Sequence, residues 1–218
     1  LHQGTSYSRS VCAQELKYDK EGNILKCDIT TDGVPYTKAY YDRMANEKKA
    51  AEKMEEKMGA YLMVYHKDAD HGLHMAISYD GLEFIALNND APLIAGDTIA
   101  EQKGIRDPHI FRGPDGTFYL AMTDLHVFGI RDGIRKTQWE RDGKKYGWGN
   151  NRGLVLMRST DLKTWTRTNL DFQKLGGEWS EVGCVWAPET CYDYEKGKLF
   201  VHFTTRTGNG HNRIYYVY

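Results

Sequence analysis

The stretch that decides the fold is HMAISYDGLEFIA, residues 74–86, because its pattern returns as GLVLMRSTDLKTWT at residues 153–166. In both copies an apolar strand ends at a serine, an aspartate follows two positions later, and an aromatic residue leads into a second strand. Another apolar strand precedes each copy, at residues 61–65 and 118–122. We expect each unit to form a small antiparallel sheet, with the aromatic residue wedged between neighbouring sheets.

A third copy begins with an apolar strand at residues 198–203 and continues with residues 213–218. A recurring unit of a few antiparallel strands is typical of a β-propeller, in which each unit is one blade, or of a related radial array. We therefore predict an all-β fold with roughly three blades visible over residues 60–218. A blade that ended at residue 218 would expose a bare strand edge, so we expect the complete propeller to continue further.

The part of the chain before residue 60 differs from the repeats. Residues 1–36 have the pattern of a strand, a turn and a second strand. Residues 37–59 are rich in Ala, Glu, Lys and Met and end on a glycine, which predicts one linker or surface helix. A helix that binds a partner is the alternative.

Composition and charge exclude several classes of protein. Hydrophobic residues make up 40 % of the 218 residues, which is enough for a packed core. The 29 basic and 30 acidic residues give a net charge of −1, which argues against nucleic-acid binding. No apolar run approaches the roughly 18 residues of a membrane helix.

His66, His71 and His74 lie near Asp68 and Asp70 but match no standard metal-binding spacing, so no metal ligand is assigned.

The first candidate for chemistry is Asp107, in GIRDPHIF at residues 104–111. We expect it near the start of a blade's innermost strand, which lines the central channel. Pro108 should restrict Asp107 to an extended backbone and aim its carboxylate into that channel. There it could act as a general base on water; alternatively, it caps the strand and pairs with Arg106 or another neighbour. His109, on the same strand, is assigned to substrate binding.

The segment VWAPET, residues 185–190, occupies the same place one repeat later, with Pro188 at the position of Pro108. Glu189 would then be a second carboxylate that faces the channel. Trp186 would offer a flat apolar partner to a sugar ring. The alternative is a structural Glu189 and a Trp186 that belongs to the core. For Glu189 we favour a binding or structural role over proton donation.

An insertion between strands of the second repeat, residues 125–152, contains His126, Trp139, Trp148 and several glycines. Blades keep their strands fixed while their loops vary and carry specificity. Trp148 stands between two glycines, so it could lie at the mouth of a pocket and bind substrate. It could equally anchor the loop.

Taken together, these motifs resemble glycoside hydrolase family 43, whose members are five-bladed β-propellers. The resemblance covers about residues 60–218 and rests on four segments in order: Arg106–Ile110, Pro114–Leu120, Arg158–Trp165 and Trp186–Glu189. It implies that Asp107 is the general base. The family's Trp-Ala-Pro-acid element is usually not the proton donor. The resemblance places the general acid, a Glu, and an Asp that tunes its pKa in later blades, after residue 218.

The resemblance further implies an inverting glycosidase that acts on plant cell-wall glycans, of the α-L-arabinofuranosidase or β-xylosidase type. Its partner is an oligo- or polysaccharide substrate. The rival interpretations are a non-catalytic carbohydrate-binding propeller and a scaffold that docks a partner through its helix. Family members often hold a cation in the channel, so Ca²⁺ could lie there, although the residues assign no cofactor.

Residues 1–36 resemble the closing end of such a propeller. We therefore expect them to complete an upstream module, while residues 60–218 open a second one. A single rearranged propeller is the alternative. The expected location is extracellular or periplasmic, although the chain shows no signal peptide.

Overall fold

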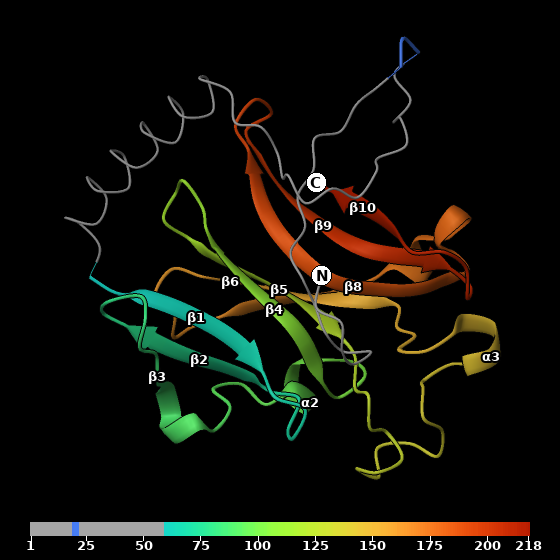
Figure 1. Ribbon diagram of the computed structural model, residues 1–218, viewed down its shortest axis with the longest axis horizontal. Helices are drawn as coiled ribbons and strands as arrows, with labels where there is room; N and C mark the ends of the chain where they lie inside the picture. Colours follow the sequence, from blue (N-terminus) through green and yellow to red (C-terminus); the bar gives the residue numbers. More distant parts are fainter. Residues whose placement is uncertain (1–18, 22–58) are drawn as a thin grey trace, which may run out of the picture. The chain divides into compact units, whose positions relative to one another are not determined.

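The computed structural model describes residues 19–21 and 59–218, and residues 59–218 form one compact unit (Figure 1). The strands predicted for residues 1–36 and the helix predicted for residues 37–59 lie outside the described residues. The blades predicted from residue 60 onward can therefore be compared with the structure along their whole length.

Three antiparallel sheets follow one another along the chain. The first contains β1 (Tyr61–His66), β2 (Leu73–Ser78) and β3 (Ile85–Ala86). The second contains β4 (Ile105–Arg112), β5 (Phe118–Asp124), β6 (Gly153–Ser159) and β7 (Thr166–Asp171). The third contains β8 (Val182–Asp193), β9 (Lys198–Thr207) and β10 (Arg213–Val217). This all-β succession of small sheets confirms the predicted propeller blades.

Short helical turns join these strands. They are η1 (Leu87–Asp90), α2 (Gly96–Ile99), α3 (Gly143–Tyr146), η2 (Phe172–Leu175) and η3 (Gly177–Trp179). Among the described residues, none of these has the length and apolar character that a membrane-spanning helix requires.

The repeated serine–aspartate pair forms the same turn in the first two sheets. In the first, the Ser78 hydroxyl donates to Asp80 Oδ1, which also accepts the backbone N–H groups of the residues two and three positions later, Leu82 and Glu83. Ser159 and Asp161 repeat this arrangement. The backbone donors favour the carboxylate form and lower the pKa of each aspartate to about 2. The turn satisfies its own polar groups locally, which explains why the sequence pattern predicts it well.

Strand β6 is buried on both faces, which explains its unbroken apolar run. Val155 packs into a core between the first two sheets, together with Leu73 and Leu120. Leu154 points to the other side and packs with Phe203 between the second and third sheets. Burying such side chains contributes roughly 1.5–3 kcal/mol each.

The predicted aromatic wedge is found in one of its two places. Trp165 packs against the core between the first two sheets, as expected for a residue between neighbouring blades. Phe84, at the equivalent position, remains 38 % exposed. Among the described residues, the wedge is therefore confirmed for the second sheet alone.

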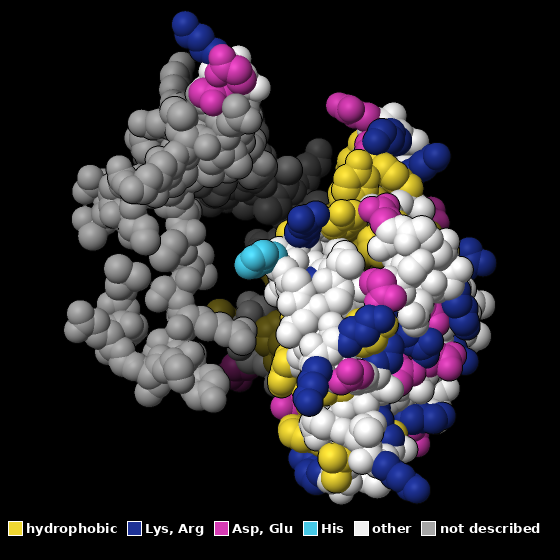
Figure 2. Space-filling view, turned by 90° about the vertical axis from the view of Figure 1, so that its right-hand side faces the viewer, with side chains coloured by type: hydrophobic (Ala, Val, Ile, Leu, Met, Phe, Trp, Pro, Cys, Tyr) yellow, Lys and Arg dark blue, Asp and Glu magenta, His cyan; other side chains and the backbone are white. Residues whose placement is uncertain are grey.

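The first strands of the second and third sheets meet near the centre of the unit. Strand β4 lies beside β1 of the preceding sheet and β8 of the following one (Figure 1). Residues near the start of β4 are therefore positioned by three sheets. The face in Figure 2 carries Lys and Arg side chains interspersed with Asp and Glu, as expected from the balanced charge.

Candidate active site

Asp107 occupies a strained position near the start of β4. The pairing of β4 with β5 shifts register between Arg106 and His109, and Asp107 has a φ of 46°. The prediction of an extended backbone was therefore wrong: a β-bulge overrides the preference that Pro108 imposes. The Asp107 N–H donates to His66 Nδ1 on β1, at 3.1 Å, and this bond helps to hold the strained backbone. Such a conformation costs about 1–3 kcal/mol and is often found at functional sites.

The carboxylate of Asp107 is exposed, and only one of its two oxygens accepts a hydrogen bond from the described residues. Among the described residues, a single hydrogen bond reaches it, from the Thr123 hydroxyl to Oδ2 at 3.1 Å. Arg106 pairs instead with Asp68, so the predicted alternative of an Asp107–Arg106 pair was wrong. Oδ1 of Asp107 thus remains available to accept a proton.

Thr123 connects Asp107 to the third sheet. The Thr123 side chain is buried, and its Oγ1 accepts the backbone N–H of Ala187 at 2.9 Å. Because that lone pair is occupied, the hydroxyl hydrogen is directed to the Asp107 carboxylate. Three sheets therefore position Asp107: β1 holds its N–H, β5 holds its Oδ2, and β8 orients the hydroxyl on β5.

Strand β8 repeats the bulge of β4. Its pairing with β9 shifts register between Trp186 and Glu189, and Ala187 has a φ of 45°. Ala187 therefore occupies the position of Asp107, and Glu189 that of His109. This agrees with the alignment of Pro188 with Pro108 in the sequence.

His109 and Glu189 form a separate polar group beside the bulges. His109 Nδ1 accepts the backbone N–H of Thr190 at 3.2 Å, which links β4 to β8 and leaves Nε2–H as a donor. Burial lowers the pKa of His109, while the Glu189 carboxylate opposes this shift. Glu189 is exposed, and its Oε2 lies 3.4 Å from His202 Nε2. Both residues can offer hydrogen bonds to a polar ligand.

Trp186 and Trp148 lie together. Their ring centroids are 5.8 Å apart with an interplanar angle of 74°, and Trp186 Nε1–H donates to the Gly149 carbonyl at 2.9 Å. Trp186 is half-buried, whereas Trp148 is 63 % exposed. The structure thus brings together two aromatic residues that the sequence placed far apart.

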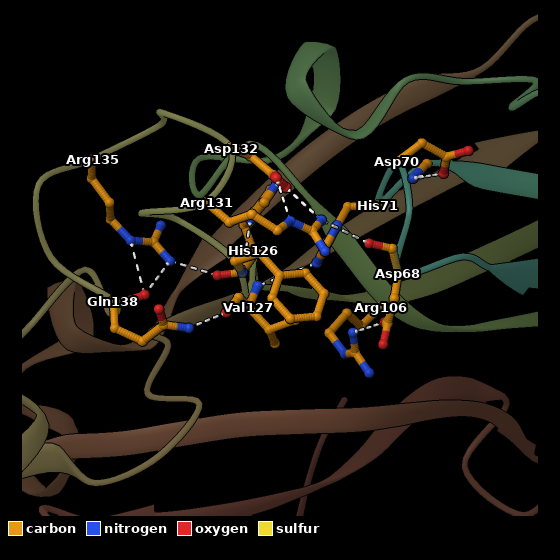
Figure 3. A network of polar contacts seen from close by, with 12 residues as sticks. Asp68, Asp70, His71, Arg106, His126, Val127, Arg131, Asp132, Arg135 and Gln138 are labelled. Atoms are coloured by element: carbon orange, nitrogen blue, oxygen red, sulfur yellow. Dashed lines mark hydrogen bonds and ion pairs between the residues drawn. The ribbon is translucent and has the colours of Figure 1, made fainter.

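A histidine pair with polar neighbours lies beside β1 and β4 (Figure 3). His71 and His126 are stacked at 3.9 Å, and His126 Nε2 lies 3.5 Å from Asp132 Oδ2. Burial lowers the pKa of both rings, that of His71 to about 4, so both are neutral at pH 7.

The hydrogen bonds of these rings determine their tautomers. Val127 N–H donates to His71 Nε2, and Phe128 N–H donates to His126 Nδ1. The remaining nitrogen of each neutral ring then carries a hydrogen, and a metal could not bind there. The His71–His126–Asp132 group is therefore better explained as a support for the loops around it.

The neighbours of Asp107 do not fit a Ca²⁺ ion. Calcium requires about 6–8 oxygen ligands. Among the described residues, the groups hydrogen-bonded to Asp107 are the Thr123 hydroxyl, which is already hydrogen-bonded on both sides, and the His66 ring, whose ligand atom is a nitrogen.

Sequence reasoning missed His66, Thr123 and Ala187. His66 is the sixth residue of β1 and Thr123 the sixth residue of β5, the equivalent apolar strand, and each accepts the N–H of the residue before a proline. Their shared position in the repeat was the only signal that could have identified these two acceptors. The signal can be interpreted only when it is known that the strands of neighbouring blades lie side by side.

The chain matches a family model and a curated protein. A family model described as a probable glycosyl hydrolase domain, related to family 43, matches residues 56–218. An alpha-L-arabinofuranosidase from Bifidobacterium longum subsp. longum is 30 % identical over 136 residues, which cover 58 % of this chain and 11 % of that protein. The chain thus spans a small part of this curated relative.

Among solved structures, the crystal structure of fructan 1-exohydrolase IIa from Cichorium intybus in complex with 1-kestose is similar, with a TM-score of 0.42 and 16 % identity. The match covers 72 % of this chain and 28 % of that one.

Proposed function

Because the chain belongs to the family of probable glycosyl hydrolase domains related to family 43, we propose that it is part of a glycoside hydrolase in which Asp107 is the general base. The observation that carries this proposal is the exposed Asp107 carboxylate on a strained bulge. A backbone in this conformation is costly, and here it places a carboxylate with one unoccupied oxygen at the junction of three sheets.

The proposed reaction is a single displacement with inversion. Asp107 Oδ1 takes a proton from water while the water oxygen bonds to the anomeric carbon of the substrate. The bond from that carbon to the leaving oxygen breaks, and a carboxylic acid protonates this oxygen. In this proposal a Glu from a later blade is the acid, its pKa tuned by an Asp. The two carboxyl groups would stand about 6.5–9.5 Å apart, which leaves room for the water.

The proposed substrates are plant cell-wall glycans that carry α-L-arabinofuranosyl or β-xylosyl units. The similarity to the Bifidobacterium alpha-L-arabinofuranosidase supports the arabinofuranosyl unit over the xylosyl unit. His109 and Glu189 would hydrogen-bond to sugar hydroxyl groups, since each has polar atoms free to do so. Trp148 and Trp186 would pack against the C–H faces of the sugar rings.

The test is the Asp107→Asn variant in the full-length protein. It preserves the shape of the side chain and can still accept the Thr123 hydrogen bond, but it lacks the basic carboxylate. We expect hydrolysis of aryl α-L-arabinofuranoside or β-xyloside to fall about 10²–10⁴-fold at unchanged melting temperature. Asp97→Asn, which changes an exposed aspartate in α2, is the matched control.

Two outcomes would overturn the proposal. Full activity of Asp107→Asn would exclude this residue as the base. A wild-type protein that binds oligosaccharides but hydrolyses none would favour the non-catalytic binding propeller. The anomeric configuration of the first product, measured by NMR, separates inversion from retention.

A further inference from the structure

Three tryptophans form one continuous aromatic wall. Trp139 contacts Trp148 with ring centroids 5.4 Å apart, and Trp148 contacts Trp186 at 5.8 Å. The first two belong to the insertion at residues 125–152, and the third belongs to β8. The wall therefore joins the insertion to a strand of the candidate active site.

The backbone around Trp148 directs its side chain to solvent. Gly147 and Gly149 have φ values of 79° and 63°, which glycine adopts most easily, and both are buried. A side chain on Gly149 would also approach the Trp186 ring to 3.0 Å. Trp148 nevertheless remains 63 % exposed between them. An anchoring residue would be buried, so the anchor interpretation of Trp148 does not fit.

Arg206 supports the wall from behind. This buried arginine donates from Nη2 to the carbonyls of Tyr146 and Trp148, at 2.9 and 2.6 Å. Its guanidinium carbon lies 4.6 Å from the centre of the Trp186 ring. One side chain thus fixes the loop and the strand together, so the wall is organised before any ligand arrives.

The wall begins close to the proposed base. Trp186 precedes Ala187, whose N–H lies 2.9 Å from Thr123 Oγ1, and this oxygen lies 3.1 Å from Asp107 Oδ2. Two hydrogen bonds therefore connect the carboxylate to the residue after Trp186. From there the wall extends through Trp148 to Trp139 in the insertion.

We propose that the Trp139–Trp148–Trp186 wall binds successive sugar units of a glycan chain next to the unit that is cleaved. This inference rests on the proposed function and narrows the substrate to chains rather than single glycosides. The neighbouring rings are inclined by 68° and 74°, so the planes of adjacent rings are steeply tilted to one another. Such a surface suits a soluble chain that turns between units, rather than a flat crystalline one.

The test measures how affinity depends on chain length. Arabino- and xylo-oligosaccharides of increasing length are titrated by calorimetry into full-length Asp107→Asn protein, alone and combined with Trp148→Ala or Trp139→Ala. We expect affinity to rise with length in Asp107→Asn. In the double variants the longer chains should lose about tenfold, equivalent to about 1.4 kcal/mol, and the shortest ligand should lose less.

Trp148→Phe should retain most of the gain with length, because it keeps an aromatic face. Tyr194→Ala is the matched control, since it removes an aromatic residue that is 79 % exposed in another turn. Equal losses for all chain lengths, or no loss, would overturn the wall as a chain-binding site. Retained hydrolysis by Asp107→Asn would instead contradict the proposed base, so the two failures are distinguishable.

Discussion

The bulges of β4 and β8 have the same backbone but different chemistry. In each, the residue before a proline has a φ near 45° (46° for Asp107 and 45° for Ala187) and donates its N–H to a side chain of the preceding sheet. In β4 that residue is Asp107, and the acceptor is an imidazole of His66. In β8 it is Ala187, and the acceptor is the hydroxyl of Thr123. The bulge is therefore a structural feature of the repeat, and the carboxylate is an addition to one copy of it.

Because the two bulges share their φ but not their side chain, backbone strain alone does not mark the candidate active site. If strain alone marked the active site, both bulges would be catalytic candidates. The chain places an ionisable group on only one of these two. The bulge at β8 instead orients the Thr123 hydroxyl that holds this group, so one copy carries the proposed base and the next one positions it.

The largest expected effect comes from making the two bulges alike. Asp107→Ala gives β4 the residue that β8 already tolerates at the same φ, so the fold should be retained. Hydrolysis should fall about 10²–10⁴-fold because the general base is lost. Activity on aryl glycosides and the melting temperature are measured together. An active Asp107→Ala protein would contradict the comparison, and Asp97→Ala serves as the control.

A smaller effect is expected when the connection between the bulges is removed. Thr123→Val keeps the shape of the side chain but leaves Asp107 Oδ2 and the Ala187 N–H without their partner. The variant should lose about 0.5–1.5 kcal/mol of stability, the usual net contribution of a hydrogen bond, because Asp107 and Ala187 are exposed and water can replace the hydroxyl. Its kcat should fall about tenfold with little change in KM, because a misplaced base affects the transition state more than binding.

Thr123→Ser restores the hydroxyl and should recover most of kcat. If Thr123→Ser and Thr123→Val lose kcat equally, the hydroxyl does not position Asp107. Denaturant unfolding followed by fluorescence gives the accompanying change in stability.

The sequence predicts those parts of this site that depend on local chemistry. The serine–aspartate turns at Ser78 and Ser159 satisfy their own polar groups within a few residues, and mostly apolar segments mark the strands before them. The bulge at Asp107 could not be predicted, because its stabilising acceptor, His66, is distant in the sequence and belongs to another sheet. The local rule for a residue before proline even pointed to the opposite conformation.

The two acceptors also differ in their response to acid. Burial and the nearby Arg106 lower the pKa of His66 below its ordinary 6.5, whereas the Thr123 hydroxyl does not titrate. When the pH falls below 6.5, the unfolded chain binds a proton at this histidine before the folded one does. The contribution of His66 to the free energy of unfolding is therefore complete above pH 6.5 and declines as the pH falls toward its folded pKa.

Melting temperatures between pH 7 and pH 5 should accordingly fall less steeply for His66→Gln than for the wild type. The difference between the two proteins is the informative quantity, because burial raises the pKa of Asp124 to about 6 and this group acts in the opposite direction. His211→Gln, at an exposed histidine, is the control. Equal slopes for His66→Gln and the wild type would mean that the β4 bulge is insensitive to acid.

The smallest expected effect concerns the strain itself. At a φ of 45°, a side chain destabilises the folded state by about 1–2 kcal/mol, and glycine avoids this cost. Glycine in turn loses about 0.5–1 kcal/mol of stability through its greater loss of backbone entropy on folding. Ala187→Gly should therefore stabilise the protein slightly, by up to about 1 kcal/mol. Ala121→Gly, on the regular strand β5, should destabilise it by at least about 0.5 kcal/mol. The free energy of unfolding, measured in urea, should therefore change in opposite directions in the two variants. That result would show that the β8 bulge is strained although it carries no ionisable group, so that its φ comes from blade packing. Equal destabilisation by both changes would refute this.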